Sequence, residues 1–345
     1  MHLGILTGGG DAPGLNAVIR AVVVRGLVGG HRTTGFLRGW KGVLENQTIE
    51  LDRESVRDLQ RQGGTILLSS RTNPRKVEGG LEKVRDNLEK AGIECLVAVG
   101  GEDTLGVART LSGMGVSVLG VPKTIDNDLS ATDYTFGFDS AINFVMEALD
   151  KLHTTARSHE RIMVVEVMGR HAGWMTLHGG IAGGAHVILI PEVEFDTDEV
   201  CDFLKKRFEA GRRYAIVAVA EGAMDPGIAR HVMHSSEKDA YGHVQLGTGI
   251  GIAEALAGEI KDRTGLETRH VILGHLQRGG PPTAFDRVLG TMLGVKVVEM
   301  AEQGLSGKMA ALRGGEVVPV DLEEAVGKLK TVPAQRYDQA RLFFD

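Results

Sequence analysis

The sequence lacks the features that mark several classes of protein. Cysteine occurs only at Cys95 and Cys201, far apart, without metal or redox spacing and in apolar contexts, so we expect two buried thiols. No long run of lysine and arginine occurs, and the net charge is −6. This argues against a nucleic-acid partner but leaves local cationic pockets open. No signal peptide or membrane-crossing stretch is present, so we expect a cytoplasmic protein with no membrane partner.

Glycine, by contrast, is abundant. It accounts for 48 of 345 residues, against a usual frequency of ~7%. Apolar content of 42% and charged content of 24% are ordinary for a globular protein. Because the sequence is not of low complexity, we expect the extra glycines in loops that approach a ligand closely. The length allows two lobes with a substantial core.

Short apolar segments alternate with amphipathic ones almost throughout the chain. We expect strands at 2–7, 95–99, 116–121, 161–167, 186–190, 214–220 and 269–274. We expect helices at 15–28, 79–91, 104–112, 139–158, 173–182, 197–210, 248–264, 284–303 and near 335–343. This alternation predicts a mainly parallel sheet with helices on both faces. No linker marks a clean boundary, so the lobes could share segments.

The segment 120–128 (Gly-Val-Pro-Lys-Thr-Ile-Asp-Asn-Asp) is the most informative stretch. It follows an expected buried strand and so places polar groups at the strand's carboxyl end, where open α/β sheets bind ligands. If the backbone is extended, Asp126 and Asp128 point to the same side. One could then accept a proton while the other orients a hydroxyl or faces a metal, and Lys123 suits a phosphate. An Asx-rich turn is the alternative interpretation.

Further polar or glycine-rich loops follow other expected strands, at 8–14, 100–104, 168–171 and 274–280. Backbone amides at helix starts bind anions, so several such loops together indicate a phosphate-handling site. The loop at 8–14 has neither the Rossmann nor the Walker spacing, and a tight strand-to-helix connection is its alternative interpretation. The histidines His171, His178 and His243 show no metal-ligand spacing.

Individual side chains in these loops suit particular tasks. Glu102 could hold Mg²⁺, which prefers a few carboxylates plus phosphate oxygens, although Asp103 beside it could simply cap a helix. Arg71 could clamp a transferring phosphoryl group or be a solvated surface residue. Arginines would bind the phosphate of a sugar phosphate, and a glutamate would accept hydrogen bonds from its hydroxyls. The residues considered for that pocket are Glu166, Met168, Gly169, Arg170, Glu221, Arg269, His275 and Arg278.

These loops, in this order, resemble the phosphofructokinase family over nearly the whole chain. The matching segments are 9–16 (GGDAPGLN), 63–67 (GGTIL), 100–104 (GGEDT), 122–128 (PKTIDND), 165–174 (VEVMGRHAGW), 220–222 (AEG) and 273–280 (LGHLQRGG). The resemblance implies an α/β fold of two doubly wound, Rossmann-like lobes with mainly parallel sheets. It also implies transfer of a phosphoryl group to the 1-hydroxyl of fructose 6-phosphate.

The resemblance also implies roles for individual residues. Asp126 matches the catalytic base, and Glu102 matches the position of the Mg²⁺ ligand. The implied catalytic group is Arg71, Lys123, Thr124, Asp126, Asp128 and Arg170. The implied donor site is Gly10, Arg71, Thr72, Gly101, Asp103, Thr104 and Lys123. The implied substrate site is Thr124, Ile125, Asp126, Arg161, Met168, Gly169, Arg170, Glu221, Arg269, His275 and Arg278.

The resemblance further implies how the chain is divided and assembled. A donor-phosphate lobe would comprise 1–138 plus about 277–304, and a sugar-phosphate lobe 139–276 plus about 305–330. Residues 331–345 would form a C-terminal helix. Arg161 and Arg269 match cations that the family contributes from a neighbouring subunit, so a homodimer or homotetramer is implied.

Asp103 indicates the phosphoryl donor. Family members that use ATP commonly have glycine there, whereas members that use pyrophosphate resemble this chain, with aspartate there and lysine at the position of Lys123. A carboxylate at 103 would crowd and repel the α-phosphate of ATP. Two unit charges 4 Å apart interact by about 4 kcal/mol at an effective dielectric of 20. Even a quarter of that energy costs roughly fivefold in affinity. We therefore expect a pyrophosphate-dependent enzyme with fructose 6-phosphate as acceptor.

Other functions were weighed. The runner-up is an ATP-dependent phosphofructokinase that tolerates Asp103. A lipid or NAD kinase is disfavoured by the residues at 168–170 and 275–278, and a catalytically dead sensor by the presence of Asp126, Asp128 and Glu102. We expect no nucleotide regulation, because Arg20 is kept but Val24 and His153 stand where regulated bacterial relatives would have arginines.

Overall fold

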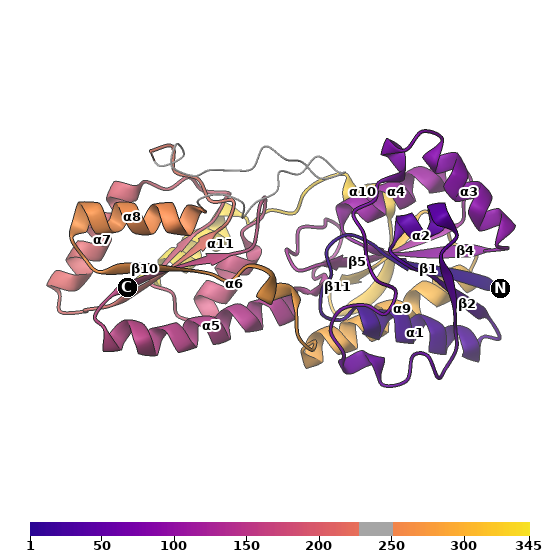
Figure 1. Ribbon diagram of the computed structural model, residues 1–345, viewed down its shortest axis with the longest axis horizontal. Coiled ribbons are helices and arrows are strands. Elements are labelled where there is room, and N and C mark those ends of the chain that lie inside the picture. Colours follow the sequence, from indigo (N-terminus) through magenta and orange to yellow (C-terminus); the bar gives the residue numbers. More distant parts are fainter. Residues whose placement is uncertain (228–250) are drawn as a thin grey trace.

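The computed structural model describes residues 1–227 and 251–345. Two lobes lie side by side, each built on its own sheet, with the N-terminus in the larger lobe and the C-terminus at the smaller one (Figure 1). The strands are mainly parallel and helices cover both faces of each sheet, so the α/β architecture expected from the sequence is confirmed.

The larger sheet has the strand order β12-β11-β5-β4-β1-β2-β3, with β6 paired to β5. Its strands are β1 His2–Thr7, β2 Arg32–Phe36, β3 Thr48–Leu51, β4 Cys95–Gly100, β5 Val118–Thr124, β6 Phe136–Gly137, β11 Lys308–Arg313 and β12 Glu316–Asp321. The central strands β1, β4 and β5 are buried along their whole length, as expected for parallel strands covered on both faces. Only the two edge strands, β3 and β12, pair antiparallel to their neighbours in this sheet.

Two groups of helices cover this sheet. Its helices are α1 Leu15–Val28, α2 Trp40–Glu45, α3 Gly80–Lys90, α4 Glu102–Gly113, α9 Ala284–Glu302 and α10 Leu322–Val326. Helices α1 and α9 share one apolar core with side chains such as Leu3 and Val97, while α2, α3, α4 and α10 share another with Leu6 and Leu96. Neighbouring strand residues thus enter opposite cores, as the two-residue repeat of a strand requires.

The smaller sheet has the order β10-β7-β9-β8 and is wholly parallel. Its strands are β7 Ile162–Val167, β8 Val187–Leu189, β9 Ala215–Ala220 and β10 Thr268–Ile272. Its helices are α5 Phe138–Ser158, α6 Trp174–Ala182, α7 Thr197–Glu209, α8 Ile252–Thr264 and α11 Ala334–Arg341. Helices α5, α6 and α11 share the core on one face, and α7 and α8 share the core on the other.

Three short 3₁₀ turns complete the described structure, at Leu59–Arg61, Pro74–Lys76 and Gly274–Arg278. Cys95 and Cys201 are both buried free thiols, as expected. Within residues 1–227 and 251–345, no helix has the length and apolar character needed to cross a membrane.

The sheet pairing corrects one expectation about the lobes. Residues 305–330 were assigned to the second lobe, yet β11 pairs with β5 and β12 pairs with β11 in the larger sheet. The prediction was wrong because β11 pairs along the edge of β5 that β4 does not occupy, which places this distant segment in the larger sheet. The expected start of the helix at 248, and His243, lie outside the described residues.

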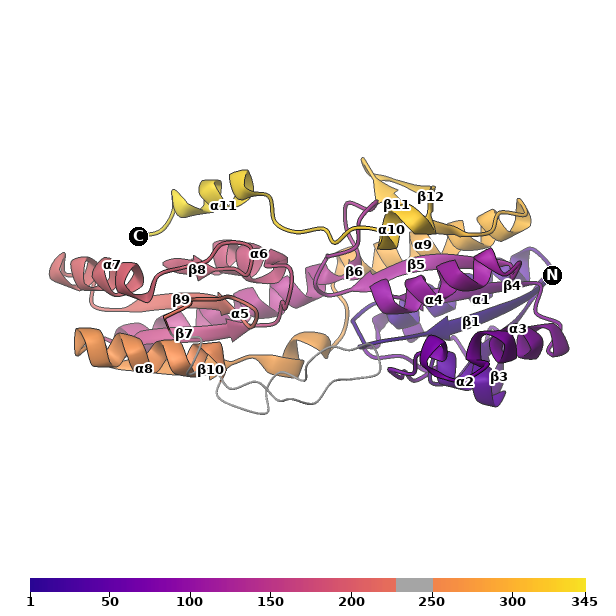
Figure 2. The same ribbon diagram turned by 90° about the horizontal axis from the view of Figure 1, so that it is seen from above.

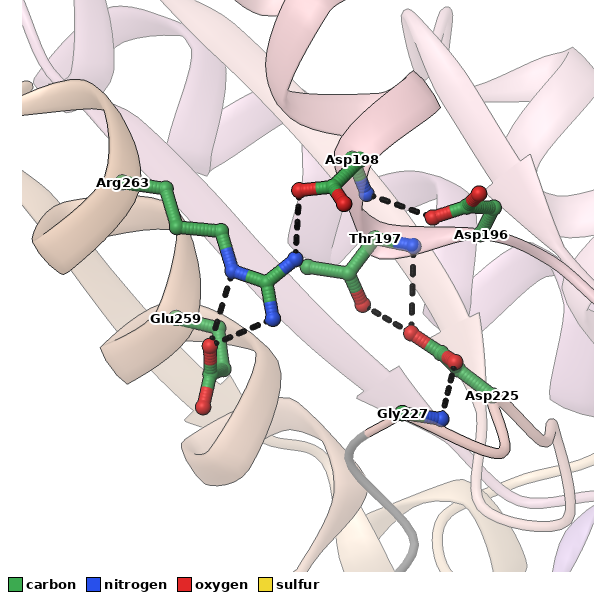
Figure 3. Close-up of polar contacts among 7 residues, drawn as sticks. All are labelled: Asp196, Thr197, Asp198, Asp225, Gly227, Glu259 and Arg263. Carbon is green, nitrogen blue, oxygen red and sulfur yellow. Dashed lines mark hydrogen bonds and ion pairs between the residues drawn. The ribbon is translucent and has the colours of Figure 1, made fainter.

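A polar network holds the start of α7 in the smaller lobe (Figure 3). Asp196 caps the helix by accepting a hydrogen bond from the Asp198 amide at 2.8 Å. The buried carboxylate of Asp225 accepts from the Thr197 amide at 3.0 Å and from its hydroxyl. Arg263 of α8 pairs with Asp198 at 2.6 Å, which ties the two helices of this face together. The network thereby fixes the turn that follows β9.

Candidate active site

Most of the predicted site residues follow the carboxyl ends of strands in the two sheets. Loops after β1, β4 and β5 come from the larger lobe, and loops after β7 and β9 come from the smaller lobe. Arg278, which follows β10 of the smaller lobe, donates to the Asp11 carbonyl in the loop after β1 at 3.2 Å, so segments of the two lobes meet at the junction. This is the edge at which open α/β sheets bind ligands.

Two glycines allow the first loop to pack closely against other site segments. Gly8 donates its amide to the Val99 carbonyl at 3.0 Å, and a Cβ at Gly8 would collide with the Thr104 side chain. A Cβ at Gly10 would collide with the guanidinium of Arg278, which donates to the Asp11 carbonyl at 3.2 Å. The close approach of Arg278 to the loop therefore requires glycine at position 10.

A cavity of about 420 Å³ lies against this loop. It is lined by Gly9, Gly10, Asp11, Thr65, Leu68, Ser69, Ser70, Arg71, His275 and Arg278. The lining combines Gly10 and Arg71, expected at the donor site, with His275 and Arg278, expected at the sugar-phosphate site. Residues from three separate segments of the chain thus surround one space with two arginines in its wall.

The segment that carries Arg71 is fastened to the glycine loop. Gly9 donates its amide to the Ser70 carbonyl at 3.2 Å and accepts a hydrogen bond from the Ser69 hydroxyl. Arg71 itself is exposed and Thr72 is half-buried. Ser69 was not among the expected site residues, because a lone serine between a turn and an arginine carries no sequence signal.

Strand β5 extends further than expected and carries Lys123 and Thr124 at its end. Lys123 is buried, and its Nζ lies 3.5 Å from the place where a Cβ on Gly9 would stand. Burial, followed by the charge of Arg278, lowers the pKa of Lys123 to about 8. The Lys123 ammonium is thus shielded from solvent near a second cation, Arg278, so binding of an anionic ligand there would be favourable.

The segment after β5 turns sharply rather than running on extended. The Asp126 amide donates to the Thr124 hydroxyl at 3.1 Å, and Asn127 adopts a left-handed conformation with φ 51°. The backbone is therefore not extended, which removes the premise for placing Asp126 and Asp128 on the same side, and a turn, the alternative interpretation, forms here. The Oδ1 atom of Asp126 is buried and has no hydrogen-bond partner among the described residues.

Three carboxylates gather at this point. Burial, and then the charge of Asp126, raise the pKa of Asp128 to about 7, with a smaller contribution from Glu102. Glu102 itself is exposed, at the first residue of α4. Within residues 1–227 and 251–345, no group of three or more His, Cys, Asp or Glu side chains is arranged to hold a metal.

The donor set nevertheless fits Mg²⁺, which keeps several waters and takes few protein carboxylates when phosphate oxygens complete its shell. Glu102 offers an exposed carboxylate, and Asp126 has a buried oxygen without a partner among the described residues. A metal held chiefly by the substrates' phosphates would suit this arrangement.

The segment 100–104 is mostly helical rather than a loop, because α4 begins at Glu102. Gly100 and Gly101 precede it, and a Cβ on Gly100 would collide with the buried Thr104. Asp103 is half-buried in the first turn. Its carboxylate is therefore held near the positive end of the helix, close to the site.

In the smaller lobe, the loop after β7 is held by side chains from elsewhere. The Gly169 amide, at φ 136°, donates to Glu221 at 3.4 Å, and the Met168 amide donates to Gln277 at 3.2 Å. Burial, and then the charge of Asp126, raise the pKa of Glu221 to about 7, while Arg170 acts in the opposite direction. Gln277 is 1% exposed and was missed as a site residue, although it lies within the quoted motif at 273–280.

Two expected substrate residues stand apart from this loop. Arg161 precedes β7 and Arg269 lies in β10 opposite Met163, at the far end of the sheet from Met168. Six strand residues separate the two ends, which corresponds to roughly 20 Å. Arg269 is paired with Glu267 at 2.7 Å. The structure therefore does not bring either arginine to the site of its own chain.

Ile125 also differs from a typical ligand-contacting residue. Its side chain is fully buried and packs in the apolar core with Ala12 and Phe138. Its contribution to a substrate site is limited to its backbone.

Comparisons with known proteins agree with this geometry. A family model described as phosphofructokinase matches residues 2–301. A pyrophosphate--fructose 6-phosphate 1-phosphotransferase of Amycolatopsis methanolica is 56% identical, with 100% of each chain covered. An ATP-dependent 6-phosphofructokinase 3 of Streptomyces coelicolor is 50% identical, with 99% of each chain covered.

A solved structure shows the same fold. Phosphofructokinase of Pichia pastoris in the T-state superposes with a TM-score of 0.83 at 32% identity and covers 99% of this chain, which spans 36% of that longer chain. The chain described here belongs to the phosphofructokinase family.

Proposed function

We propose that the enzyme transfers a phosphoryl group from pyrophosphate to the 1-hydroxyl of fructose 6-phosphate, giving fructose 1,6-bisphosphate and phosphate, and that the reaction is reversible. The observation that carries the choice of donor is Asp103 in the first turn of α4, together with the buried Lys123. The Amycolatopsis methanolica relative, named for this reaction, is 56% identical over the full length.

In this proposal each lobe has one substrate. The larger lobe binds pyrophosphate through the backbone of Gly10 and Gly101 and through Arg71 and Lys123. The smaller lobe binds the sugar phosphate through Met168, Gly169, Arg170 and Glu221, joined by His275 and Arg278. Arg161 and Arg269, which lie far from their own site, would reach the site of a neighbouring subunit in a dimer or tetramer.

Asp126 acts as the general base. It takes the proton from the 1-hydroxyl as that oxygen attacks the terminal phosphorus, and the departing phosphate leaves in line. Thr124 and Asp128 lie beside it, and the arginines stabilise the charge on the transferred group. Mg²⁺, held by Glu102 and the substrates' phosphates, would supply neutralisation of the donor's charge. The cytoplasmic location expected from the sequence is kept in this proposal.

The donor assay tests the proposal directly. Fructose 6-phosphate is incubated with Mg²⁺ and either pyrophosphate or ATP, and fructose 1,6-bisphosphate is measured. We expect activity with pyrophosphate and little with ATP. The Streptomyces coelicolor relative is named as ATP-dependent, so the opposite outcome has a specific precedent. Activity with ATP and none with pyrophosphate would reject the choice of donor.

Substitution of Asp103 separates the two reasons for excluding ATP. Asp103→Gly removes both bulk and charge and should lower the KM for ATP by roughly fivefold or more. Asp103→Asn keeps the bulk and removes the charge, so it shows how much of the effect is electrostatic. If neither variant improves the use of ATP, the barrier to ATP lies elsewhere.

A further inference from the structure

A segment near the C-terminus crosses from one lobe to the other beside the proposed base. It comprises residues 328–332, between α10 of the larger lobe and α11 at the smaller lobe (Figure 2). We call it the strap. Residues 328–332 themselves form neither a helix nor a strand. None of its residues belongs to the motifs that identified the active site.

The backbone of the strap pairs with the segment that follows Asp126. Leu329 forms an isolated antiparallel bridge with Leu129, and the Lys330 amide donates to the Asp128 carbonyl at 2.8 Å. The Ser130 hydroxyl donates to the Lys328 carbonyl. The strap therefore extends alongside the base-bearing segment as a short additional strand would.

The side chain of Lys330 then enters this segment. Its ammonium donates to Asn127 Oδ1 at 2.9 Å, to the Thr132 carbonyl at 2.9 Å and to the Asp133 carbonyl at 3.0 Å. An ammonium has three hydrogens to donate, and all three have acceptors here. Lys330 Nζ therefore holds three points of the loop 127–133 together.

Asn127 is the point at which the segment turns. Its backbone is left-handed, with φ 51°, a conformation that costs energy for a residue with a side chain. Its Oδ1 accepts from Lys330 and also from the Thr135 amide at 3.1 Å. Asn127 stands directly between Asp126 and Asp128. A contact that holds its side chain therefore also restrains the backbone from which both carboxylates extend.

The other end of the strap is fixed to the sugar-phosphate side. The Trp174 indole donates to the Lys330 carbonyl at 2.8 Å. The Val332 amide donates to Glu192 at 2.8 Å, and the same carboxylate accepts from the Gly173 amide at 3.0 Å. Gly173 and Trp174 follow shortly after Arg170 in the chain. The strap thus joins the loop of the proposed base to the loop of the proposed sugar-phosphate site.

We propose that Lys330 is a positioning residue for phosphoryl transfer, which acts through Asn127 to hold Asp126 in line with the acceptor hydroxyl. The inference rests on the proposed function, because it takes Asp126 to be the base. Lys330 makes no contact with substrate in this account and is not itself catalytic. A residue that only stabilised the fold would lower the melting temperature without changing the kinetics of the folded enzyme.

The test compares Lys330→Met with Lys328→Met, the same change at an exposed strap residue. We expect Lys330→Met to lose about 10²-fold in kcat, the scale of a small misplacement of a reacting group. The KM and the calorimetric Kd for fructose 6-phosphate should stay nearly unchanged, and Lys330→Arg should recover part of the kcat. Lys328→Met should match the unmodified enzyme. An equal kcat for both methionine variants would overturn the proposal.

A double-mutant cycle tests the route through Asn127. Asn127→Gly removes the amide while allowing the left-handed backbone. If Lys330 acts through Asn127, the double variant loses less than the product of the two single losses in kcat. Fully multiplicative losses would overturn the route. The comparison uses whichever donor the unmodified enzyme accepts, so failure of the pyrophosphate assignment and failure of this inference give different results.

Discussion

The two lobes hold their site residues in different ways. In the larger lobe, close packing between neighbouring segments positions the site residues. Thr104 lies against Gly8 and Gly100, and the site groups are at the ends of strands or at the start of a helix. In the smaller lobe, side chains from distant segments hold the loop after β7. Gln277 accepts from Met168, and Glu192 accepts from Gly173.

The site residues of the two lobes therefore differ in which contacts must form before they are held in place. The larger lobe positions Gly8, Gly100 and Thr104 by packing that forms with the sheet itself, whereas its segment after β5 is also held by Lys330 of the strap. The smaller lobe requires the chain to return twice, first at the 3₁₀ turn Gly274–Arg278 and then at the strap, before its loop is fixed. We infer that substitutions in the larger lobe's site mainly slow the chemical step, whereas substitutions in the smaller lobe's site first weaken the binding of the sugar phosphate.

The largest expected effect is on the proposed base. Asp126→Asn should lower kcat by about 10³-fold, because general base catalysis contributes roughly 10²–10⁴-fold. The KM for fructose 6-phosphate should change little. Glu221→Gln, the equivalent change in the smaller lobe, should instead raise that KM and lower kcat less. Steady-state kinetics with both substrates measure the two effects.

Asp150→Asn is the control for these carboxylate-to-amide changes, since Asp150 is exposed on α5 away from the site. It should leave both constants unchanged. A loss of kcat from Glu221→Gln as large as that from Asp126→Asn would contradict the assignment of the chemical step to the larger lobe and of sugar-phosphate binding to the smaller lobe.

The next effect concerns pH. The pKa of Lys123 is lowered to about 8, so its ammonium is charged below pH 8 and loses its proton as the pH rises through that value. If the ammonium binds pyrophosphate, kcat/KM for pyrophosphate should fall above pH 8 by about tenfold per pH unit. Burial also lowers the pKa of Lys330 to about 8, so its titration should lower kcat/KM for both substrates. The part due to Lys123 should be seen only in kcat/KM for pyrophosphate, because at saturating pyrophosphate the bound anion keeps Lys123 charged.

Lys123→Met provides the comparison for the pH profile. It should lower kcat/KM for pyrophosphate at pH 7 and remove the difference between the pH profiles measured with the two substrates. An unchanged difference in this variant would assign the titration to another group.

The smallest effect is expected away from the site. Asp196→Ala removes the cap of α7 and should destabilise the protein by about 1 kcal/mol. This corresponds to about 2 °C in melting temperature. Asp202→Ala, in the interior of the same helix, should not lower it. Neither variant should change kcat, and a change in kcat for Asp196→Ala would show that this face of the smaller lobe is coupled to the active site.

The sequence predicted the larger part of the fold because most strands are continuous apolar runs bounded by glycine. The strands β2, β3, β6, β11 and β12 were missed. β6 has two residues and β3 and β12 are largely exposed, while β2 and β11 are mostly buried but contain polar residues or are bounded by charged ones. The boundary at 305–330 was misjudged for a related reason. A strand's own residues do not state which distant edge it will pair with, and β11 found its partner in β5.

Most of the candidate site was also visible from the sequence, because phosphate-handling loops need glycines and charged residues at fixed spacings. Gln277, Glu192 and Lys330 escaped notice, since a single polar residue in an ordinary segment has no spacing to recognise. Their importance depends on which backbone groups they meet in the folded chain.

The amino-acid order by itself determined the alternating architecture, the family and the chemical groups available at the strand ends. Local steric preferences and the apolar pattern suffice for these. Only the tertiary structure decided that Asp126 and Asp128 are separated by a left-handed turn, that Lys123 is stripped of water, and that a C-terminal strap joins the two halves of the site. These features arise from contacts between residues far apart in the chain, and no local pattern encodes such contacts.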